Sequence, residues 1–194
     1  MRRRELLAGL AGLSALGGAG FLYRSGAIGG DGESGVDPVS LPTVEAPGSP
    51  GADVTVPARG RVSLVTFFAT WCHVCAAEME PLGAVAVDLD ESVQLVSVTN
   101  EPVGHSVSRP EIREWWREHD GDWPVALDPD LALTDALDVG GVPTLLVLDA
   151  DNRVTWRHQG RASAETIRSK VARARQPTGD GDRRLADARR GDRA

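Results

Sequence analysis

Lysine is nearly absent from this sequence. Of 21 basic residues only Lys170 is a lysine, against 28 Asp and Glu, and the formal net charge is −7. The first 30 residues carry four Arg and one Glu, a net +3, so the remainder carries −10. Phosphate binding needs clustered basic residues, and this acidic body therefore excludes nucleic acid as an expected partner. We interpret many acids with one lysine as adaptation to high salt, a hypothesis that equal stability with and without molar salt would contradict.

Cysteine is also scarce, with two residues in 194. Two cysteines cannot form a disulfide scaffold. Cys72 and Cys75 are separated by two residues, and a disulfide closing so short a loop adds little stability through chain entropy. The Cys-x-x-Cys pair therefore indicates thiol–disulfide chemistry. A hydrophobic content of 41% is sufficient for a packed core, and the length suits one domain with extensions.

The first 25 residues are predicted to be an export signal or a membrane anchor. Three arginines at positions 2–4 precede an apolar run rich in Gly and Ala, which is the order of an export signal. The paired arginines followed by two leucines resemble a twin-arginine signal that lacks its usual preceding Ser or Thr. We expect an extracytoplasmic protein, exported or anchored to the outer face of the cytoplasmic membrane, that contacts the membrane only through this segment.

Two further segments are predicted to be extensions of a domain at residues 41–175. Residues 26–40 are dense in Gly, Pro, Ser and acid, which is typical of a flexible spacer. Residues 176–194 mix Arg, Asp and Gly without apolar periodicity, so we expect a disordered tail.

Strands and helices alternate along the predicted domain. The apolar, β-branched run at 62–68 is typical of a central strand buried on both faces. Alternation at 52–56 and a turn at 57–60 predict a short edge hairpin. The order predicts an α/β domain with a central mixed β-sheet flanked by helices. The other predicted strands are 93–98, 123–127, 144–148 and 154–156; the helices are 76–89, 110–117, 131–137 and 163–175; and a loop is predicted at 100–108.

Cys72 lies where a strand gives way to a helix. If the helix starts there, its sulfur lies beside unpaired backbone N–H groups and the positive end of the helix dipole. Both favour the thiolate, so the pKa of Cys72 is expected to fall below that of free cysteine. Cys72 would then attack and Cys75 would resolve the mixed disulfide. His73 either stabilises the thiolate as a cation, making the couple more oxidising, or is an exposed spacer without influence.

Several motifs resemble one superfamily in the same order. Residues 68–75, Phe-Ala-Thr-Trp-Cys-His-Val-Cys, resemble the active-site segment of the thioredoxin superfamily. Glu78 and the following Met-Glu-Pro-Leu resemble the TlpA/ResA-like branch, and Gly-Val-Pro-Thr at 141–144 resembles the cis-proline loop. The long interval between these motifs leaves room for the inserted strand–helix of that branch. The resemblance covers about residues 41–175 and implies a thioredoxin fold with an N-terminal hairpin.

The resemblance implies a role for each matching position. The cysteine pair would be a redox-active disulfide. Pro143 would be cis and, with Val142, would face the disulfide and guide an extended substrate segment. Trp71 would flank the site and tune it, as would Val142 and His73; the alternative for Trp71 is plain packing. Glu78 would tune or relay protons near the second cysteine, or else be a solvated helix carboxylate.

Three positions depart from the superfamily pattern. Val74 replaces the proline often found before the second cysteine, which leaves the redox potential open. Pro81 comes one residue later than the usual helix proline, so the expected helix kink shifts. Thr66 occupies the strand position at which cytoplasmic thioredoxins carry a buried acid. Any proton acceptor must come from elsewhere, and Glu78 is the candidate.

The leading interpretation is an exported thiol–disulfide oxidoreductase of the protein-disulfide reductase type. It would exchange disulfides with proteins bearing thiols or disulfides, without cofactor or metal. The TlpA/ResA likeness implies reduction of specific cysteines, in cytochrome maturation or copper sites, with a membrane redox donor as a further partner. The alternative is a copper-handling protein, since thiolates suit Cu(I). Its third ligand would be one of three histidines without diagnostic spacing, His105, His119 and His158.

Overall fold

The structure, a computed structural model, describes residues 35–176. The predicted export signal, the predicted spacer up to residue 34 and the predicted tail from residue 177 lie outside the described residues. Within residues 35–176, no helix is both long enough and apolar enough to cross a membrane.

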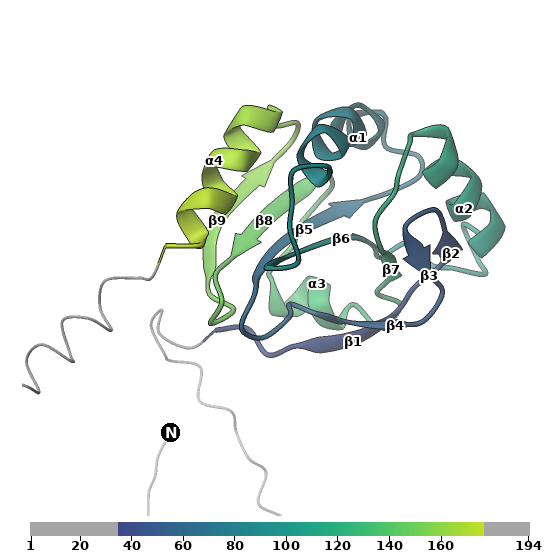
Figure 1. Ribbon diagram of the computed structural model, residues 1–194. Helices are drawn as coiled ribbons and strands as arrows, with labels where there is room; N and C mark the ends of the chain where they lie inside the picture. Colours follow the sequence, from purple (N-terminus) through teal and green to yellow (C-terminus); the bar gives the residue numbers. More distant parts are fainter. Residues whose placement is uncertain (1–34, 177–194) are drawn as a thin grey trace, which may run out of the picture. The chain divides into compact units, whose positions relative to one another are not determined.

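A five-stranded mixed sheet forms the centre of the fold (Figure 1). Its strand order is β7-β6-β5-β8-β9, with β5, β6 and β7 parallel and β8 and β9 antiparallel to their neighbours. Strands β5 to β8 are buried along their whole lengths, which confirms the prediction of a central strand at 62–68. The bounds are β5 (Val62–Phe68), β6 (Val93–Thr99), β7 (Val125–Leu127), β8 (Thr144–Leu148) and β9 (Val154–Gln159).

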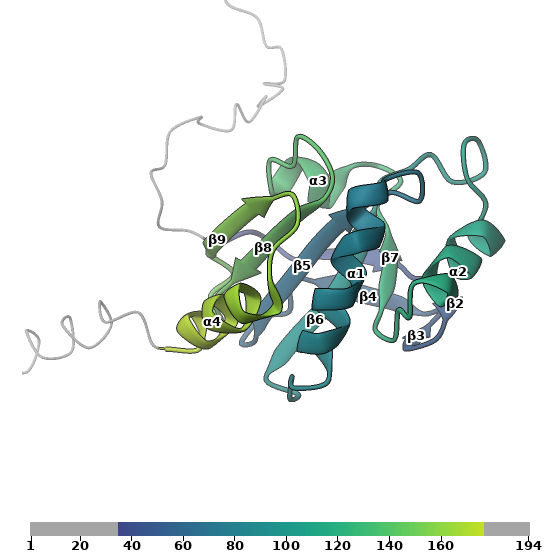
Figure 2. The same ribbon diagram turned by 90° about the horizontal axis from the view of Figure 1, so that it is seen from above.

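Helices cover both faces of this sheet (Figure 1, Figure 2). Three helices pack on one face: α1 (His73–Ala86), α2 (Arg109–Glu118) and α4 (Ala164–Ala174). The other face carries the short helix α3 (Ala132–Ala136) and the antiparallel pair β1 (Val39–Pro42) and β4 (Asp53–Val56). A small hairpin of β2 (Glu45–Ala46) and β3 (Ser49–Pro50) joins β1 to β4 and contacts α2.

Alternate side chains of β5 enter two separate apolar clusters. Leu64 and Phe68 belong to the cluster beneath α1, α2 and α4, while Val65 and Phe67 belong to the cluster that contains the side chains of α3 and β1. Successive side chains of a strand point to opposite faces, so a strand buried on both sides must be apolar throughout. This double burial holds β5, and with it the segment that follows Phe68, in one position.

Helix α1 begins at His73 and ends at Ala86, whereas the prediction placed it at 76–89. The early start follows from Cys72, which caps the helix with an extended backbone and a sulfur that accepts the N–H of Cys75. Cysteine is outside the usual set of capping residues, so no sequence signal marked this start.

The N-terminal hairpin is paired differently from the prediction. Strand β4 pairs with β1, with Val39 opposite Val56, rather than across the turn at 57–60. The fold also begins inside the predicted spacer, because the Val36 N–H donates to the Asn152 carbonyl at 2.9 Å. A Cβ on Gly35 would lie 1.8 Å from the Asp151 carbonyl oxygen, so this glycine serves a close approach of two backbones rather than flexibility.

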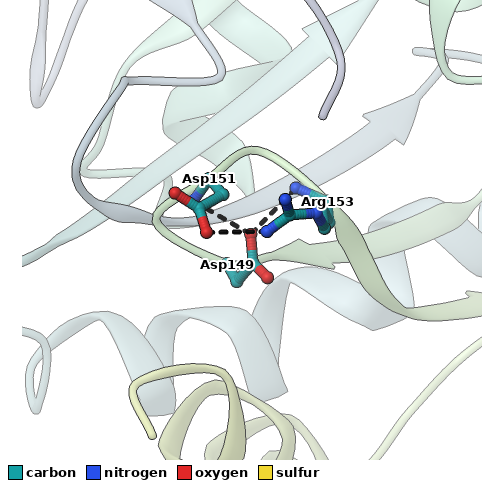
Figure 3. Close-up of polar contacts among 3 residues, drawn as sticks. All are labelled: Asp149, Asp151 and Arg153. Atoms are coloured by element: carbon teal, nitrogen blue, oxygen red, sulfur yellow. Dashed lines mark hydrogen bonds and ion pairs between the residues drawn. The ribbon is translucent and has the colours of Figure 1, made fainter. Parts of the chain in front are cut away.

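The turn between β8 and β9 is held by Asp149 (Figure 3). Its Oδ1 accepts hydrogen bonds from the backbone N–H groups of Asp151 at 3.0 Å and Arg153 at 2.9 Å, and the Arg153 guanidinium pairs with Asp151 at 2.6 Å. Gly60 also docks here, donating its N–H to the Ala150 carbonyl. Because Ser63 pairs with Leu148, this turn lies at the start of β5, the end of the sheet remote from the cysteines.

Candidate active site

Cys72 and Cys75 form a disulfide with a Cα–Cα distance of 5.2 Å. The Cys72 Sγ accepts a hydrogen bond from the Cys75 N–H at 3.1 Å, at the N-terminal end of α1. Cys72 is 8% exposed and Cys75 is 2% exposed. Cys72 thus lies at the helix N-terminus, the condition on which its expected thiolate depended, and its surroundings favour a thiolate through the helix dipole and the N–H that its sulfur accepts.

The segment leading to Cys72 is a tight turn after β5. The Cys72 N–H donates to the Ala69 carbonyl at 3.1 Å, and the Ala76 N–H donates to the Cys72 carbonyl at 3.1 Å. The turn starts from a rigid base, because the Phe68 ring stacks on Trp115 at a centroid distance of 4.8 Å.

The Val142–Pro143 peptide bond is cis, as the resemblance implies. Strand β8 starts at the next residue, Thr144, which pairs with Phe67 near the end of β5. This register brings Pro143 to the same end of the sheet as the cysteine pair. Val142 is half-buried and Pro143 is buried, and the Pro143 carbonyl accepts the N–H of Gly160 at 2.9 Å.

Apolar side chains around the disulfide are exposed rather than packed. Trp71 is 70% exposed and Val74 is 49% exposed. His73 is exposed as well. The packing alternative for Trp71 is therefore wrong, and the disulfide carries an apolar rim that another molecule can contact.

Glu78 is buried, with 1% of its surface exposed, so the alternative of a solvated carboxylate is wrong. It lies three residues after Cys75 on the buried side of α1. Its Oε2 accepts the Ala162 N–H at 2.9 Å, while its Oε1 has no hydrogen-bond partner among the described residues. Burial raises the pKa of Glu78 to about 7, although the Ala162 N–H and the nearby Arg161 charge lower it in part. Glu78 can therefore hold or accept a proton near neutral pH.

The segment 160–162, between β9 and α4, touches both sides of the candidate site. The Gly160 N–H donates to the carbonyl of Pro143, and the Ala162 N–H donates to the carboxyl of Glu78. Arg161 reaches back to Glu80 on α1 at 3.1 Å. A surface cleft of about 440 Å³ lies here between α1 and the start of α4, with Pro81 and Ala84 in its wall.

Glu101 was missed in the sequence, where residues 100–108 were predicted to be a loop. It is 6% exposed, and its carboxyl oxygens accept the N–H of Thr70 at 2.8 Å and the hydroxyl of Thr70 at 2.9 Å. The hydroxyl of Thr99 donates to the same carboxyl at 3.1 Å. One signal was present, since an acid two residues after an apolar strand lies near the end of the sheet where β5 also ends.

The described histidines do not assemble a metal site. Within residues 35–176, no three His, Cys, Asp or Glu side chains are grouped so that they could hold a metal ion. His119 stacks on Trp115 at 4.3 Å, His158 stacks on Trp156 at 5.5 Å, and His105 is exposed.

Comparison with known proteins identifies the family of this chain. Residues 37–175 match the family model described as Redoxin. The chain belongs to the Redoxin family. This Redoxin-family protein is 25% identical over 113 residues to the thiol-disulfide oxidoreductase YkuV of Bacillus subtilis strain 168, covering 58% of this chain and 76% of YkuV. It is 23% identical over 110 residues to the thiol-disulfide oxidoreductase ResA of Bacillus cereus strain ZK / E33L, covering 56% of this chain and 61% of ResA.

Solved structures confirm the predicted thioredoxin fold. The crystal structure of the pneumococcal exposed lipoprotein thioredoxin Etrx1 from Streptococcus pneumoniae strain TIGR4 superposes with a TM-score of 0.60 at 19% identity, covering 71% of this chain and 99% of that chain. The Redoxin-family match and the names of both curated relatives confirm the enzyme class, thiol–disulfide oxidoreductase.

Proposed function

We propose that this protein is an exported oxidoreductase that exchanges disulfides with protein substrates. Cys72 is the attacking thiol and Cys75 is the resolving thiol. The observation that carries the proposal is the position of Cys72: it caps α1, it is the more exposed cysteine of the pair, and the exposed Trp71 directly precedes it. A thiolate at a helix N-terminus is the group that attacks a disulfide sulfur.

In the reductive direction, the Cys72 thiolate attacks one sulfur of the substrate disulfide. A mixed disulfide forms, and the other substrate sulfur leaves as a thiolate that takes a proton from water. Cys75 then gives its proton to the Glu78 carboxylate and attacks the Cys72 sulfur, releasing the second substrate thiolate. Two electrons pass to the substrate, and the protein ends with the Cys72–Cys75 disulfide seen here.

The substrate is proposed to lie as an extended segment between two surfaces. The exposed Trp71 and Val74 give it apolar contacts on one side. Val142 and the cis Pro143, at the same end of the sheet, give it a second side. His73 is exposed beside the attacking sulfur, where a cationic side chain would favour the thiolate.

The resemblance of Glu78 and the residues after it to the TlpA/ResA-like branch supports the reductive direction and a role in cytochrome maturation or copper-site assembly, with a membrane redox donor that returns electrons to the protein, and one curated relative is named thiol-disulfide oxidoreductase ResA. The reduction potential tests this direction. We expect a value near that of thioredoxin, about −270 mV, by equilibration with glutathione. A value near about −120 mV, at the strongly oxidising end, would contradict it.

The location is part of the same proposal. The arginines at 2–4 and the apolar run after them support export by the twin-arginine route, and the acidic composition with one lysine supports a high-salt surrounding. Cell fractionation tests the location, and recovery of the protein in the cytoplasmic fraction alone would contradict it.

The Cys75→Ser variant is expected to trap substrates. With Cys72 intact and no resolving thiol, each mixed disulfide persists until an external thiol reduces it. The measurement is affinity purification from the native host without reductant, followed by release with dithiothreitol. The matched control is Cys72→Ser, which keeps one thiol but removes the attacking sulfur. The proposal fails if Cys75→Ser captures no more protein than the control.

A further inference from the structure

Glu101 is a buried carboxyl group that the mechanism above does not use. It lies two residues after β6 and is 6% exposed. Its hydrogen bonds come from the backbone and hydroxyl of Thr70 and from the hydroxyl of Thr99. All three of these groups donate, so the carboxyl acts only as an acceptor, which is the hydrogen-bonding pattern of an ionised carboxylate.

A buried carboxylate is costly unless its hydrogen bonds offset the loss of water. An apolar residue at this position would leave the N–H and hydroxyl of Thr70 and the hydroxyl of Thr99 without this acceptor. The partner of Glu101 is also informative. Thr70 belongs to the turn between β5 and α1, two residues before Cys72, and both of its polar hydrogens point to this one side chain.

We propose that Glu101 is a positioning residue for disulfide exchange, which fixes the turn before Cys72 and whose negative charge limits the thiolate fraction of Cys72. The inference rests on Cys72 being the attacking thiol of the proposed function. Two Cα–Cα steps of about 3.8 Å separate Thr70 from Cys72, so the Cα of Cys72 is at most about 7.6 Å from that of Thr70. The Glu101 carboxylate oxygen lies 2.8 Å from the Thr70 nitrogen, so its charge is within about 15 Å of the Cys72 sulfur, a range at which it still shifts a buried thiolate where the effective dielectric constant is low.

Glu101 therefore opposes the helix terminus. The N-terminal end of α1 favours the Cys72 thiolate, and the carboxylate behind Thr70 disfavours it. Two other ionisable groups lie near the cysteine pair, His73 at the helix start and Glu78 on the buried side of α1. Both remain unchanged when Glu101 is substituted, so their contributions cancel in a comparison with the wild type.

The test is Glu101→Gln, which keeps the size of the side chain and removes its charge. The thiolate is measured by ultraviolet absorbance during a pH titration of the reduced protein, and the dithiol–disulfide equilibrium is measured against glutathione. We expect the thiolate fraction below the midpoint to rise about 3- to 10-fold, and the reduced form to be favoured by a similar factor. A tenfold change corresponds to about 30 mV. A folded Glu101→Gln protein with wild-type titration and equilibrium would overturn the proposal.

Thr99→Val is the matched control. It removes the hydroxyl that donates to the Glu101 carboxyl and accepts the Glu101 N–H, and it leaves the charge and both Thr70 hydrogen bonds in place. We expect lower stability with a thiolate fraction within about twofold of wild type. An effect as large as that of Glu101→Gln would show that loss of packing, not the charge, is responsible, and would overturn the proposal.

Glu101→Met serves if the Gln variant does not fold. It removes the charge and keeps an unbranched side chain of similar length, so the thiolate fraction is expected to rise about 3- to 10-fold as well. An unchanged titration in this variant would overturn the proposal. The alkylation rates of the single thiols in Cys75→Ser and Cys72→Ser, compared with each other, separately test which cysteine attacks, so failure of the proposed function is distinguishable from failure of this inference.

Discussion

The Cys72→Ser variant is expected to lose disulfide exchange by about 1,000-fold or more. A serine hydroxyl does not ionise at neutral pH and cannot replace a thiolate as the attacking group, and removal of a catalytic nucleophile has effects of this size. The remaining thiol, Cys75, is 2% exposed and lies behind Cys72 in the first turn of α1. The measurement is the rate of insulin disulfide reduction with dithiothreitol as the electron source.

The two single variants should differ in the step that they block. Cys75→Ser is expected to form one mixed disulfide with a small disulfide reagent at nearly the wild-type rate and then to stop, because attack is retained and resolution is lost. Cys72→Ser is expected to react slowly at the first step. If Cys72→Ser instead formed the mixed disulfide at the wild-type rate through Cys75, the assigned roles of the two cysteines would be reversed.

In the wild type, Glu78 is expected to lower the free energy of unfolding by about 3 kcal/mol as the pH rises from 4.5 to above 7. The Glu78→Gln variant is expected to lack this pH-dependent loss. Burial raises the pKa of Glu78 from 4.5 to about 7, so between these values the folded protein holds a proton that the unfolded chain has released. The wild type is therefore most stable with respect to this group below pH 4.5, and it loses that stability as the pH rises through 7. Gln carries no charge and still presents an oxygen to the Ala162 N–H. The measurement is chemical unfolding of the oxidised protein across this pH range.

Glu80→Gln is the matched control for this titration. Glu80 lies on the same helix and pairs with Arg161, but the pair is exposed to solvent and contributes little. Its substitution should leave the pH dependence of unfolding nearly unchanged.

Glu78→Gln should also slow the release of substrate from the mixed disulfide, because Cys75 loses its proton acceptor. If the free energy of unfolding depends on pH in the same way in Glu78→Gln and in the wild type, the raised pKa of Glu78 is contradicted.

Short-range sequence patterns predicted those strands whose bounds depend only on neighbouring residues. Strands β5 and β8 have the predicted bounds, because a continuous apolar and β-branched run between turns has few other solutions. The pairing of β4 with β1 could not be predicted from local patterns. The turn at 57–60 is equally compatible with pairing of β4 to the residues that follow the turn. The start of α1 also escaped, because its cap is a sulfur.

The candidate site residues also fall into two groups: those identified by a short motif, and those whose burial depends on a distant segment. The motifs identified the cysteine pair and the cis Pro143, each from a short segment. The burial of Glu78 depends on Ala162, 84 residues away in the sequence, and that of Glu101 depends on Thr70, 31 residues away. A single sequence carries no signal of which distant segment will cover a carboxyl group. The sequence could therefore mark the positions of Glu78 and Glu101, by a motif and by a place after an apolar strand, but not their burial.

The anchoring of Val36 at the turn after β8 places the start of the described chain at the end of the sheet opposite the disulfide. The described chain enters the domain there, beside Asn152, while the disulfide opens at the other end of the sheet. An attachment made ahead of Gly35, to a membrane or to another protein, would hold the domain from behind. The disulfide would then lie on the side of the domain away from the attachment point, where partner proteins can approach it.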